Sequence, residues 1–392
     1  MPAPIAAMQA ALREQGLDAW LFYDHHERDP LAYRILQFTA HRTPTRRWYY
    51  LVPAQGEPRA LVHAVEPSML DALPGEKHKY SGWQTQLDGL TDLLKGCRKV
   101  AMQYSPRNAV PYVSMVDAGT IEVIQGLGVT VVTSANLVQY FEARWTDAQL
   151  EQHREAGRRV DAVHQAAFAE IGRRLAAGET VGEWDIKRFI LDRFAAAGLI
   201  TDHGPIVAVN ANASNPHYEP FADASTPIRK GDTVLIDLWA KLDQPDAVYY
   251  DVTWVGSCGP AKEKVVEVFE TVRDARDAAL AKVQQAVAAG QTLHGFEVDD
   301  AARNFIRAKG YGDYFVHRTG HNIGRDVHGA GANMDNLETH DERLVIPRTC
   351  FSIEPGIYLP EFGIRLEIDC YVSDNSAGPT GMVQRELVPI CG

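Results

Sequence analysis

The chain has 392 residues, a formal net charge of −12 at pH 7 and 45% hydrophobic residues. This length predicts two to three domains with large apolar cores. The acidic balance argues against nucleic-acid binding and membrane-surface binding, which require a basic patch. No apolar run approaches the length of a membrane span, and the start of the chain has no secretory-signal pattern. Five scattered cysteines without C-x-x-C spacing indicate reduced thiols, so we expect a cytoplasmic protein.

Residues 1–145 alternate between strand and helix patterns. A helical pattern that ends at Gly16 precedes the strand-like segment LDAWLFY, and residues 46–63 read as two strands around a Gly-Glu-Pro turn. We expect a helix that begins near Pro67, followed by the strands KVAMQYS and VTVVTSA. This alternation predicts a small α/β layer domain.

A tandem pair of histidines, His25 and His26, lies between Asp24 and Glu27 at the end of the first strand. The group resembles a metal cluster, but neighbouring residues on a strand point to opposite faces, and loop histidines are usually solvated. We therefore do not expect a metal there. A loop that borders the active site of a neighbouring subunit is the alternative function for His25 and His26.

Residues 146–392 contain two similar halves. A long amphipathic helix is predicted from Asp147 to Ala177, with Thr146 as its N-cap. Downstream, AAGETVGEWDIKRFILDRFAAAG at 176–198 recurs as AAGQTLHGFEVDDAARNFIRAKG at 288–310, an offset of 112 residues. This extended self-similarity predicts a duplicated unit of helix and strands, and not a solenoid, which needs more copies.

Four carboxylates stand in apolar, strand-like runs, two in each half. Asp237 ends VLID and Glu354 ends FSIE, whereas Asp251 ends YYD and Glu367 ends RLE. One such acid alone commonly faces solvent or pairs with an arginine. A buried carboxylate loses its hydration at a high cost unless a cation or a proton replaces the water. If the halves pack about a pseudo-two-fold axis, the four acids converge and predict a shared cation site.

The glycine-rich stretch TGHNIGRDVHG at 319–329 adds His321 to these acids. Four carboxylates and one imidazole exceed what one ion needs, and they suit two divalent ions that share bridging carboxylates. Oxygen donors with one nitrogen suit Mn²⁺, Co²⁺, Fe²⁺ or Zn²⁺. A water that bridges two such ions loses a proton near neutral pH, so the expected reaction is hydrolysis.

The motifs resemble those of the pita-bread metallopeptidases, which include Xaa-Pro dipeptidases (prolidases), Xaa-Pro aminopeptidases and methionine aminopeptidases. The family's five metal ligands match Asp237, Asp251, His321, Glu354 and Glu367. The resemblance implies an α+β pita-bread catalytic domain over 146–392 with an internal pseudo-two-fold repeat. The α/β domain before it, over 1–145, is similar to the creatinase-like N-terminal domain of the proline-specific branch.

The resemblance also implies a role for each ligand. Asp237 would chelate one ion, and Asp251 and Glu367 would bridge both. His321 and Glu354 would complete the two sites. Glu354 would also accept a proton from the bridging water and pass it to the leaving nitrogen.

Four further residues are implied around the substrate. His328 would donate a hydrogen bond to the scissile carbonyl oxygen, and His217 would contact the substrate near its proline end. His317 would be a substrate-side or proton-relay histidine, or else a packed residue without substrate contact. Arg365 would hold a carboxylate ligand in place or meet substrate charge, or else pair with an acid in its strand.

Together with the ligand set, the resemblance implies a two-metal Xaa-Pro dipeptidase with Mn²⁺ as the expected metal. It also implies a homodimer that acts on proline-containing dipeptides or short peptides. An Xaa-Pro aminopeptidase that acts on longer peptides is the close alternative. A creatinase-like metal-free hydrolase and a non-catalytic binding module are further alternatives, although both typically lack ligands that are all present here. Asp237 and Asp251 are further apart than is usual in the family, and Trp254, Arg325 and Gly329 are unusual residues for their positions. These departures concern the substrate pocket.

Overall fold

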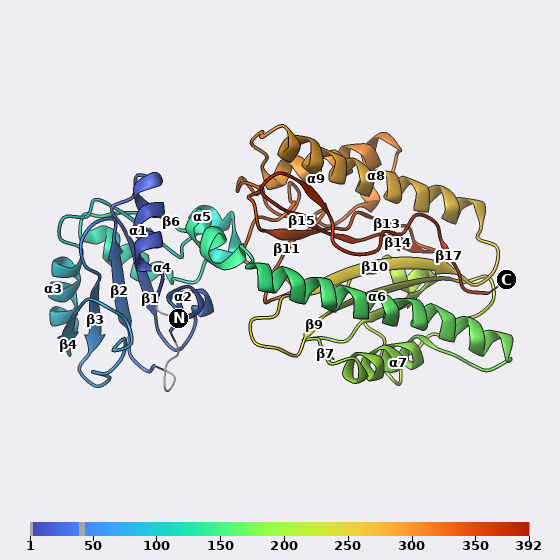
Figure 1. Ribbon diagram of the computed structural model, residues 1–392, viewed down its shortest axis with the longest axis horizontal. Helices are drawn as coiled ribbons and strands as arrows, with labels where there is room; N and C mark the ends of the chain where they lie inside the picture. Colours follow the sequence, from blue (N-terminus) through green and yellow to red (C-terminus); the bar gives the residue numbers. More distant parts are fainter. Residues whose placement is uncertain (1–2, 39–43, 392) are drawn as a thin grey trace. The chain divides into compact units, whose positions relative to one another are not determined.

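The computed structural model of this protein describes residues 3–38 and 44–391. Its chain contacts define two compact units, residues 1–142 and 143–392 (Figure 1). No helix within the described ranges is both long enough and apolar enough to cross a membrane.

The first unit is built on a six-stranded mixed sheet with the strand order β4-β3-β2-β1-β5-β6. The strands are β1 (Ala19–Asp24), β2 (Trp48–Pro53), β3 (Arg59–His63), β4 (Glu76–Tyr80), β5 (Lys99–Met102) and β6 (Thr130–Thr133). The helices are α1 (Ile5–Glu14), α2 (Pro30–Leu36), α3 (Trp83–Leu93), α4 (Ala118–Gly126) and α5 (Ala135–Val138). Short helical turns are η1 (Pro106–Asn108), η2 (Pro111–Val113) and η3 (Gln139–Ala143).

The predicted strands of this unit are present, but the helix expected near Pro67 is wrong. Residues 64–73 form turns, and Leu70 has a left-handed φ of 66°. The left-handed backbone at Leu70 interrupts a helix within about one turn of Pro67, and Pro74 with Gly75 ends the segment. The next regular element is instead β4, whose sequence EKHKY gives no hydrophobic pattern.

The second unit contains four long helices and eleven strands in the described range. The helices are α6 (Asp147–Ala176), α7 (Glu183–Ala196), α8 (Glu263–Ala288) and α9 (Gly295–Ala308), with the short turns η4 (Asn210–Ser214) and η5 (Gly312–Tyr314). The strands of the first half and its sheet are β7 (Leu199–Ile200), β8 (Ile206–Val209), β9 (Thr233–Leu242), β10 (Tyr250–Ser257) and β17 (Val388–Pro389). The other strands are β11 (Asn322–Ile323), β12 (Cys350–Ile353), β13 (Gly356–Tyr358), β14 (Gly363–Arg365), β15 (Ile368–Val372) and β16 (Ala377–Pro379).

The long helix α6 begins where its sequence predicts. The Thr146 hydroxyl oxygen accepts a hydrogen bond from the Gln149 backbone N–H, and Gln149 Oε1 accepts one from the Thr146 backbone N–H. This reciprocal pair satisfies backbone donors that the first helical turn leaves open. The helix ends at Ala176, one residue before the predicted end.

The two halves of this unit share one plan. Helix α9 begins and ends 112 residues after α7, at 295 against 183 and at 308 against 196. β8 pairs antiparallel with β9, which pairs antiparallel with β10. β11, β12 and β15 repeat that pattern. In Figure 1, α6 and α7 lie on one side of the strands, and α8 and α9 lie on the other.

Candidate metal centre

Two of the predicted ligands lie on the hairpin of β9 and β10. Asp237 on β9 is directly opposite Thr253 on β10, and Asp251 is two residues before Thr253. Since side chains alternate between the faces of a strand, all three point to the same face. Asp237 and Asp251 are both buried, with exposed fractions of 8% and 5%. The first half therefore presents two buried carboxylates side by side.

The second half brings its acids to the same place. The Glu367 N–H donates to the Thr253 carbonyl oxygen at 3.1 Å, and the Thr253 hydroxyl donates to Glu367 Oε2 at 2.7 Å. Glu354 follows β12, where its N–H donates to the carbonyl oxygen of Thr319 at 2.7 Å. Thr253 is thus the contact that joins a carboxylate of one half to the strand of the other.

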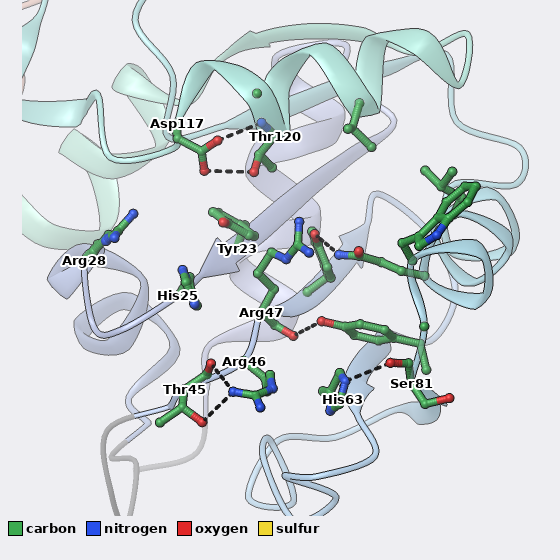
Figure 2. A pocket seen from close by; sticks show the side chains of 18 residues that line it. Tyr23, His25, Arg28, Thr45, Arg46, Arg47, His63, Ser81, Asp117 and Thr120 are labelled. Carbon is green, nitrogen blue, oxygen red and sulfur yellow. Dashed lines mark hydrogen bonds between the residues drawn. The ribbon is translucent and has the colours of Figure 1, made fainter.

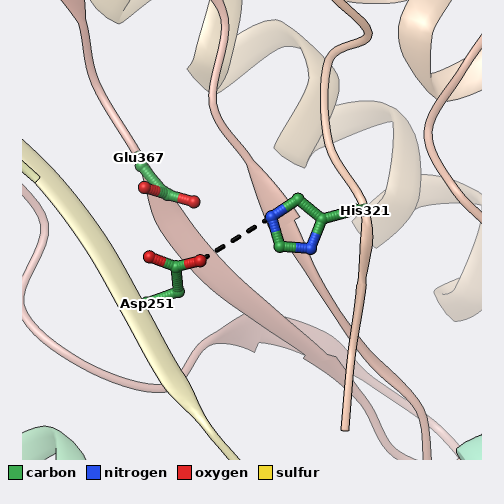
Figure 3. A group of neighbouring side chains, drawn as sticks. All are labelled: Asp251, His321 and Glu367. Carbon is green, nitrogen blue, oxygen red and sulfur yellow. Dashed lines mark ion pairs between the residues drawn. The ribbon is translucent and has the colours of Figure 1, made fainter. Parts of the chain in front are cut away.

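His321 completes the cluster (Figure 3). Its Nε2 lies 3.3 Å from Glu354 Oε1 and 3.6 Å from Asp251 Oδ2. Asp251, His321 and Glu367 each offer a ligand atom, and these atoms lie within 4.8 Å of one another. Within the described ranges no other group of three potential ligands is so close, so His25 and His26 belong to none.

A glycine allows this approach of His321. A Cβ on Gly320 would meet the Ser352 carbonyl oxygen at 1.9 Å, far inside contact distance. The Ser352 hydroxyl accepts from the His321 N–H at 3.0 Å and donates to Glu354 Oε1 at 3.1 Å. Only glycine lets the chain pass this closely to β12, which is why the motif places a glycine before the histidine.

The imidazole of His321 is neutral and oriented. Its Nδ1 lies 3.3 Å from the Asn322 carbonyl oxygen, which can only accept, so Nδ1 carries the proton. Nε2 therefore turns its lone pair toward the acids, as a metal ligand requires. Burial lowers the pKa of His321 well below its usual range, and the neighbouring His328 lowers it further.

The buried carboxylates of the cluster have too few positively charged neighbours. Burial raises the pKa values of Asp251 and Glu367 well above the usual range, and repulsion between the neighbouring acids adds to the shift. Burial likewise raises the pKa of Glu354 to about 7. Asp237 Oδ1 and Asp251 Oδ1 are buried and accept no hydrogen bond in the described structure. A divalent cation would supply both the missing partner and the missing charge, so these residues fit a metal.

Arg365 on β14 partly compensates one of the acids. Its guanidinium pairs with the Asp237 carboxylate and lies 3.9 Å from Glu354 Oε2. It also donates to the Tyr358 hydroxyl at 3.1 Å. Asp251 and Glu367 form no ion pair with a lysine or arginine among the described residues. One guanidinium therefore serves four acids, and the others must keep a proton or bind a cation when they are buried.

The three other histidines singled out by sequence occupy different positions. The exposed His328 ring packs edge-on against His321, with ring centroids 4.2 Å apart. His217 is exposed on the loop after η4, and Arg365 tethers this loop through the Pro216 carbonyl oxygen at 3.4 Å. His328 thus contacts a residue of the acid cluster, whereas His217 stands on a loop that Arg365 tethers.

His317 is held by two hydrogen bonds. Nδ1 contacts the Arg318 carbonyl oxygen at 2.7 Å, and Nε2 contacts the Tyr358 hydroxyl at 2.6 Å. Nδ1 must donate to the carbonyl, so Nε2 accepts from Tyr358. His317 reaches the acids only through Tyr358 and then Arg365. This geometry favours the packed, non-contacting alternative considered for His317.

Comparison with known proteins identifies the family. Residues 151–374 match the model of "Metallopeptidase family M24", which is more than half of the chain.

The chain belongs to metallopeptidase family M24.

This M24 chain is 28% identical over 310 residues to an "Xaa-Pro dipeptidase" of Lactobacillus delbrueckii subsp. lactis, covering 77% of this chain and 78% of the relative. Dipeptidase PepE from Mycobacterium ulcerans has a similar structure, with a TM-score of 0.72, 23% identity and coverage of 99% and 97% of the two chains. Prolidase from Thermococcus sibiricus has a TM-score of 0.65 at 24% identity, covering 98% of each chain. These full-length likenesses confirm the predicted fold class, an α/β N-terminal domain and an α+β pita-bread domain with an internal repeat.

Several residues that support the M24 site were missed by sequence reasoning. Asp369 is buried, and its Oδ2 accepts from the Asp251 N–H at 2.9 Å. Thr253 joins the two halves, and Tyr358 links His317 to Arg365. A usable signal existed for two of them, because Thr253 follows Asp251 by two residues and Asp369 follows Glu367 by two. That spacing keeps a side chain on the same face of a strand.

Proposed function

We propose that this M24 metallopeptidase hydrolyses the Xaa-Pro bond of dipeptides, with two divalent ions held by Asp237, Asp251, His321, Glu354 and Glu367. One observation carries the proposal. Buried carboxylates from both halves, with few cationic neighbours, converge on Nε2 of the neutral His321. The Xaa-Pro dipeptidase of L. delbrueckii, which aligns over most of this chain, supports the substrate class.

The ions would supply Lewis acidity toward a carbonyl oxygen and toward water. Mn²⁺ is the expected ion, with Co²⁺, Zn²⁺ and Fe²⁺ as chemically similar alternatives. Two further expectations belong to the same proposal: the cytoplasmic location that the scattered cysteines indicate, and the homodimer that the family resemblance implies.

Glu354 is the acid best placed to move a proton. Its side chain is 15% exposed, whereas the whole Glu367 residue is 2% exposed. It can therefore meet both a water and a leaving nitrogen, while the Ser352 hydroxyl fixes its Oε1. Glu367 is instead held in place by Thr253.

The exposed histidines would act on the peptide itself. His328, packed against His321, would donate a hydrogen bond to the oxygen of the scissile carbonyl as negative charge develops there. His217 would contact the proline end of the substrate. An Xaa-Pro bond has no N–H and a fixed φ, so recognition must rest on the carbonyl, the ring and the termini.

Hydrolysis of Ala-Pro and of Ala-Pro-Ala tests the proposal, with the metal-stripped protein and after addition of Mn²⁺. We expect metal-dependent cleavage that is restricted to the dipeptide. Equal or faster release of alanine from the tripeptide would assign the chain to the aminopeptidases. No cleavage of either peptide with Mn²⁺ bound would overturn Xaa-Pro hydrolysis altogether.

A further inference from the structure

The first unit contains a cavity of about 890 Å³ at one edge of its sheet (Figure 2). This volume lies within the range of roughly 300–1,000 Å³ that is typical of small-molecule sites. All of its lining residues belong to residues 23–123, and none is a predicted metal ligand. The hydrolytic site described above therefore does not account for it.

The sheet topology places this cavity where ligands commonly bind. β1 is antiparallel to β2, β2 is antiparallel to β3, and β3 is parallel to β4, so β1, β3 and β4 run in one direction. The cavity is lined by His25 just after β1, by His63 at the end of β3 and by Ser81 just after β4. These are carboxyl ends of strands, the edge at which open α/β sheets bind their ligands.

Three arginines give the cavity a positive wall. Arg28, Arg46 and Arg47 line it, and none of them forms an ion pair with a carboxylate in the described structure. Figure 2 shows the Arg47 side chain reaching into the middle of the labelled group. The single lining acid, Asp117, is already engaged, because its two oxygens accept from the N–H and the hydroxyl of Thr120 at 2.9 and 2.8 Å. Arg46 Nη1 donates to the Thr45 carbonyl oxygen at 3.0 Å and to its hydroxyl at 3.3 Å, which are neutral acceptors. The cavity thus has three guanidinium charges that no carboxylate neutralises.

The lining histidines agree with a positive potential. His63 accepts from the Val65 N–H through Nδ1 and donates to the Ser81 carbonyl oxygen through Nε2, so it is a neutral, fixed donor. Burial lowers the pKa of His25, and repulsion from His26, Arg28 and Arg47 lowers it further. The positive neighbours that lower the pKa of His25 are the same groups that would attract an anion.

Aromatic side chains form the remaining wall. Tyr49 and Tyr80 are fixed by hydrogen bonds, from Gln86 Nε2 to the Tyr49 hydroxyl at 2.7 Å and from the Tyr80 hydroxyl to the Arg47 carbonyl oxygen at 2.8 Å. Trp83 begins α3 and is 67% exposed, the largest exposed fraction among the described large hydrophobic residues. An indole left in water beside a cationic cavity offers a flat surface for a ligand ring.

We propose that this cavity binds a small organic carboxylate that carries a flat ring. The guanidinium groups of Arg46 and Arg47 receive the carboxylate oxygens, because the planar fork of arginine matches a carboxylate and few protein acids compete for it. The ring packs against Trp83. The proposal is independent of the hydrolytic function, since it concerns binding to the first unit.

Calorimetric titration of the full-length protein with benzoate tests this proposal, with benzamide as a neutral probe of the same shape and inorganic phosphate as an anion without a ring. We expect saturable benzoate binding, weaker phosphate binding and no benzamide binding. The Trp83 emission should change on binding, as the difference between the wild type and Trp83→Phe reports. Benzamide binding as tight as that of benzoate would overturn the role of charge, and phosphate binding as tight as that of benzoate would overturn the role of the ring.

A matched pair of variants locates the site. Arg47→Gln should weaken benzoate binding by about tenfold or more, the usual effect of losing a charged hydrogen-bond partner. Arg98→Gln makes the same charge change just before β5, at the amino ends of the parallel strands and away from the cavity. It should leave the affinity unchanged. Equal effects of both variants, or no saturable benzoate binding at millimolar concentration, would overturn the proposal. Circular dichroism of each variant separates loss of binding from loss of fold.

Discussion

The Glu354 side chain is 15% exposed, against 11% for Asp237 and 6% for Asp251. Glu354→Gln keeps its shape and its hydrogen bond to Ser352 but cannot accept a proton. We expect kcat for Ala-Pro to fall by about 100-fold or more, the range of general acid-base catalysis, with an unchanged circular dichroism spectrum. The control is Glu361→Gln, which changes an exposed glutamate in the turn between β13 and β14. Comparable kcat values in the two variants would remove Glu354 from proton transfer.

Asp29 at the start of α2 predicts a pH effect on stability. Burial raises the pKa of Asp29 to about 7, from an ordinary value of 3.8. Between these values the folded state holds a proton that the unfolded state has lost, so the contribution of Asp29 to the free energy of unfolding falls as pH rises. Asp29→Asn keeps the cap on the Ala32 N–H and should reduce this decline.

Urea unfolding across that pH interval measures the effect of Asp29. The difference in unfolding free energy between Asp29→Asn and wild type should grow in favour of the variant as pH rises. Asp88→Asn, at an exposed position of the same unit, should show a constant difference. A constant difference for both variants would show that Asp29 is ionised in the folded protein.

The residues of the site could be predicted only in part. Asp237, Asp251, His321, Glu354 and Glu367 stand out because an acid in an apolar run, or a histidine among glycines, demands a chemical reason. Tyr358 does not stand out, and the two-residue spacing of Thr253 from Asp251 indicates only that both side chains share a face. The importance of Tyr358 and Thr253 arises from contacts with residues more than a hundred positions away, or from a chain of hydrogen bonds that ends at Arg365. No local pattern carries that information.

At the scale of elements, the loop that carries His217 is fastened by Glu183, the first residue of α7. Glu183 is fully buried and accepts from the Val209 and Thr226 backbone N–H groups, from Asn212 and from the Tyr218 hydroxyl, at 2.7–2.9 Å. One buried carboxylate thus connects both ends of this loop to a helix. The loop position depends on α7 more than on its own sequence.

Replacement of Glu183 should therefore be costly. Glu183→Ala leaves the Val209 and Thr226 N–H groups and the Tyr218 hydroxyl without this acceptor, whereas Asn212 Nδ2 still has two others. Each buried unsatisfied group costs about 1–3 kcal/mol. We expect a loss of about 3 kcal/mol or more in the free energy of unfolding, measured in urea. Glu179→Ala removes an exposed glutamate that pairs with Arg173 and Arg174, and it should cost less than about 1 kcal/mol. Similar losses for both variants would contradict the fastening role.

Sequence predicted the elements of the second unit better than those of the first. The start of α6 follows from Thr146 and Gln149, and the equal offset of α7 and α9 follows from the repeated segment. In contrast, the segment near Pro67 has helix-compatible residues, but the left-handed backbone at Leu70 interrupts it. β4 was missed because four of its five residues are glutamate, lysine or histidine. The strand therefore shows no alternation of apolar and polar residues.

At the scale of the whole molecule, the centre should destabilise the second unit when it lacks metal and stabilise it when loaded. Buried like charges oppose folding, and an ion that binds only the folded state adds stability by mass action. Asp251→Asn should therefore raise the Tm of the chelated protein, by roughly 2–4 °C for each kcal/mol of repulsion removed. The same variant should lose most of the increase in Tm that Mn²⁺ gives the wild type.

Thermal unfolding of four samples tests whether the effect of Asp251→Asn on Tm depends on the metal. The samples are wild type and Asp251→Asn, each with chelator and with Mn²⁺. Asp243→Asn, an exposed position in the same hairpin, controls for the change in net charge. A variant that is less stable than wild type under both conditions would show that Asp251 supports the fold without an ion.

The exposed edge of the first sheet has one more consequence. β4 ends the sheet, and an unpaired edge is a template on which a second chain can add a strand. Its sequence EKHKY places lysines and a glutamate along that edge, and an incoming strand would have to strip water from them. The charges that hide β4 from a hydrophobic pattern are thus the same charges that protect a concentrated solution of this protein from edge-to-edge aggregation.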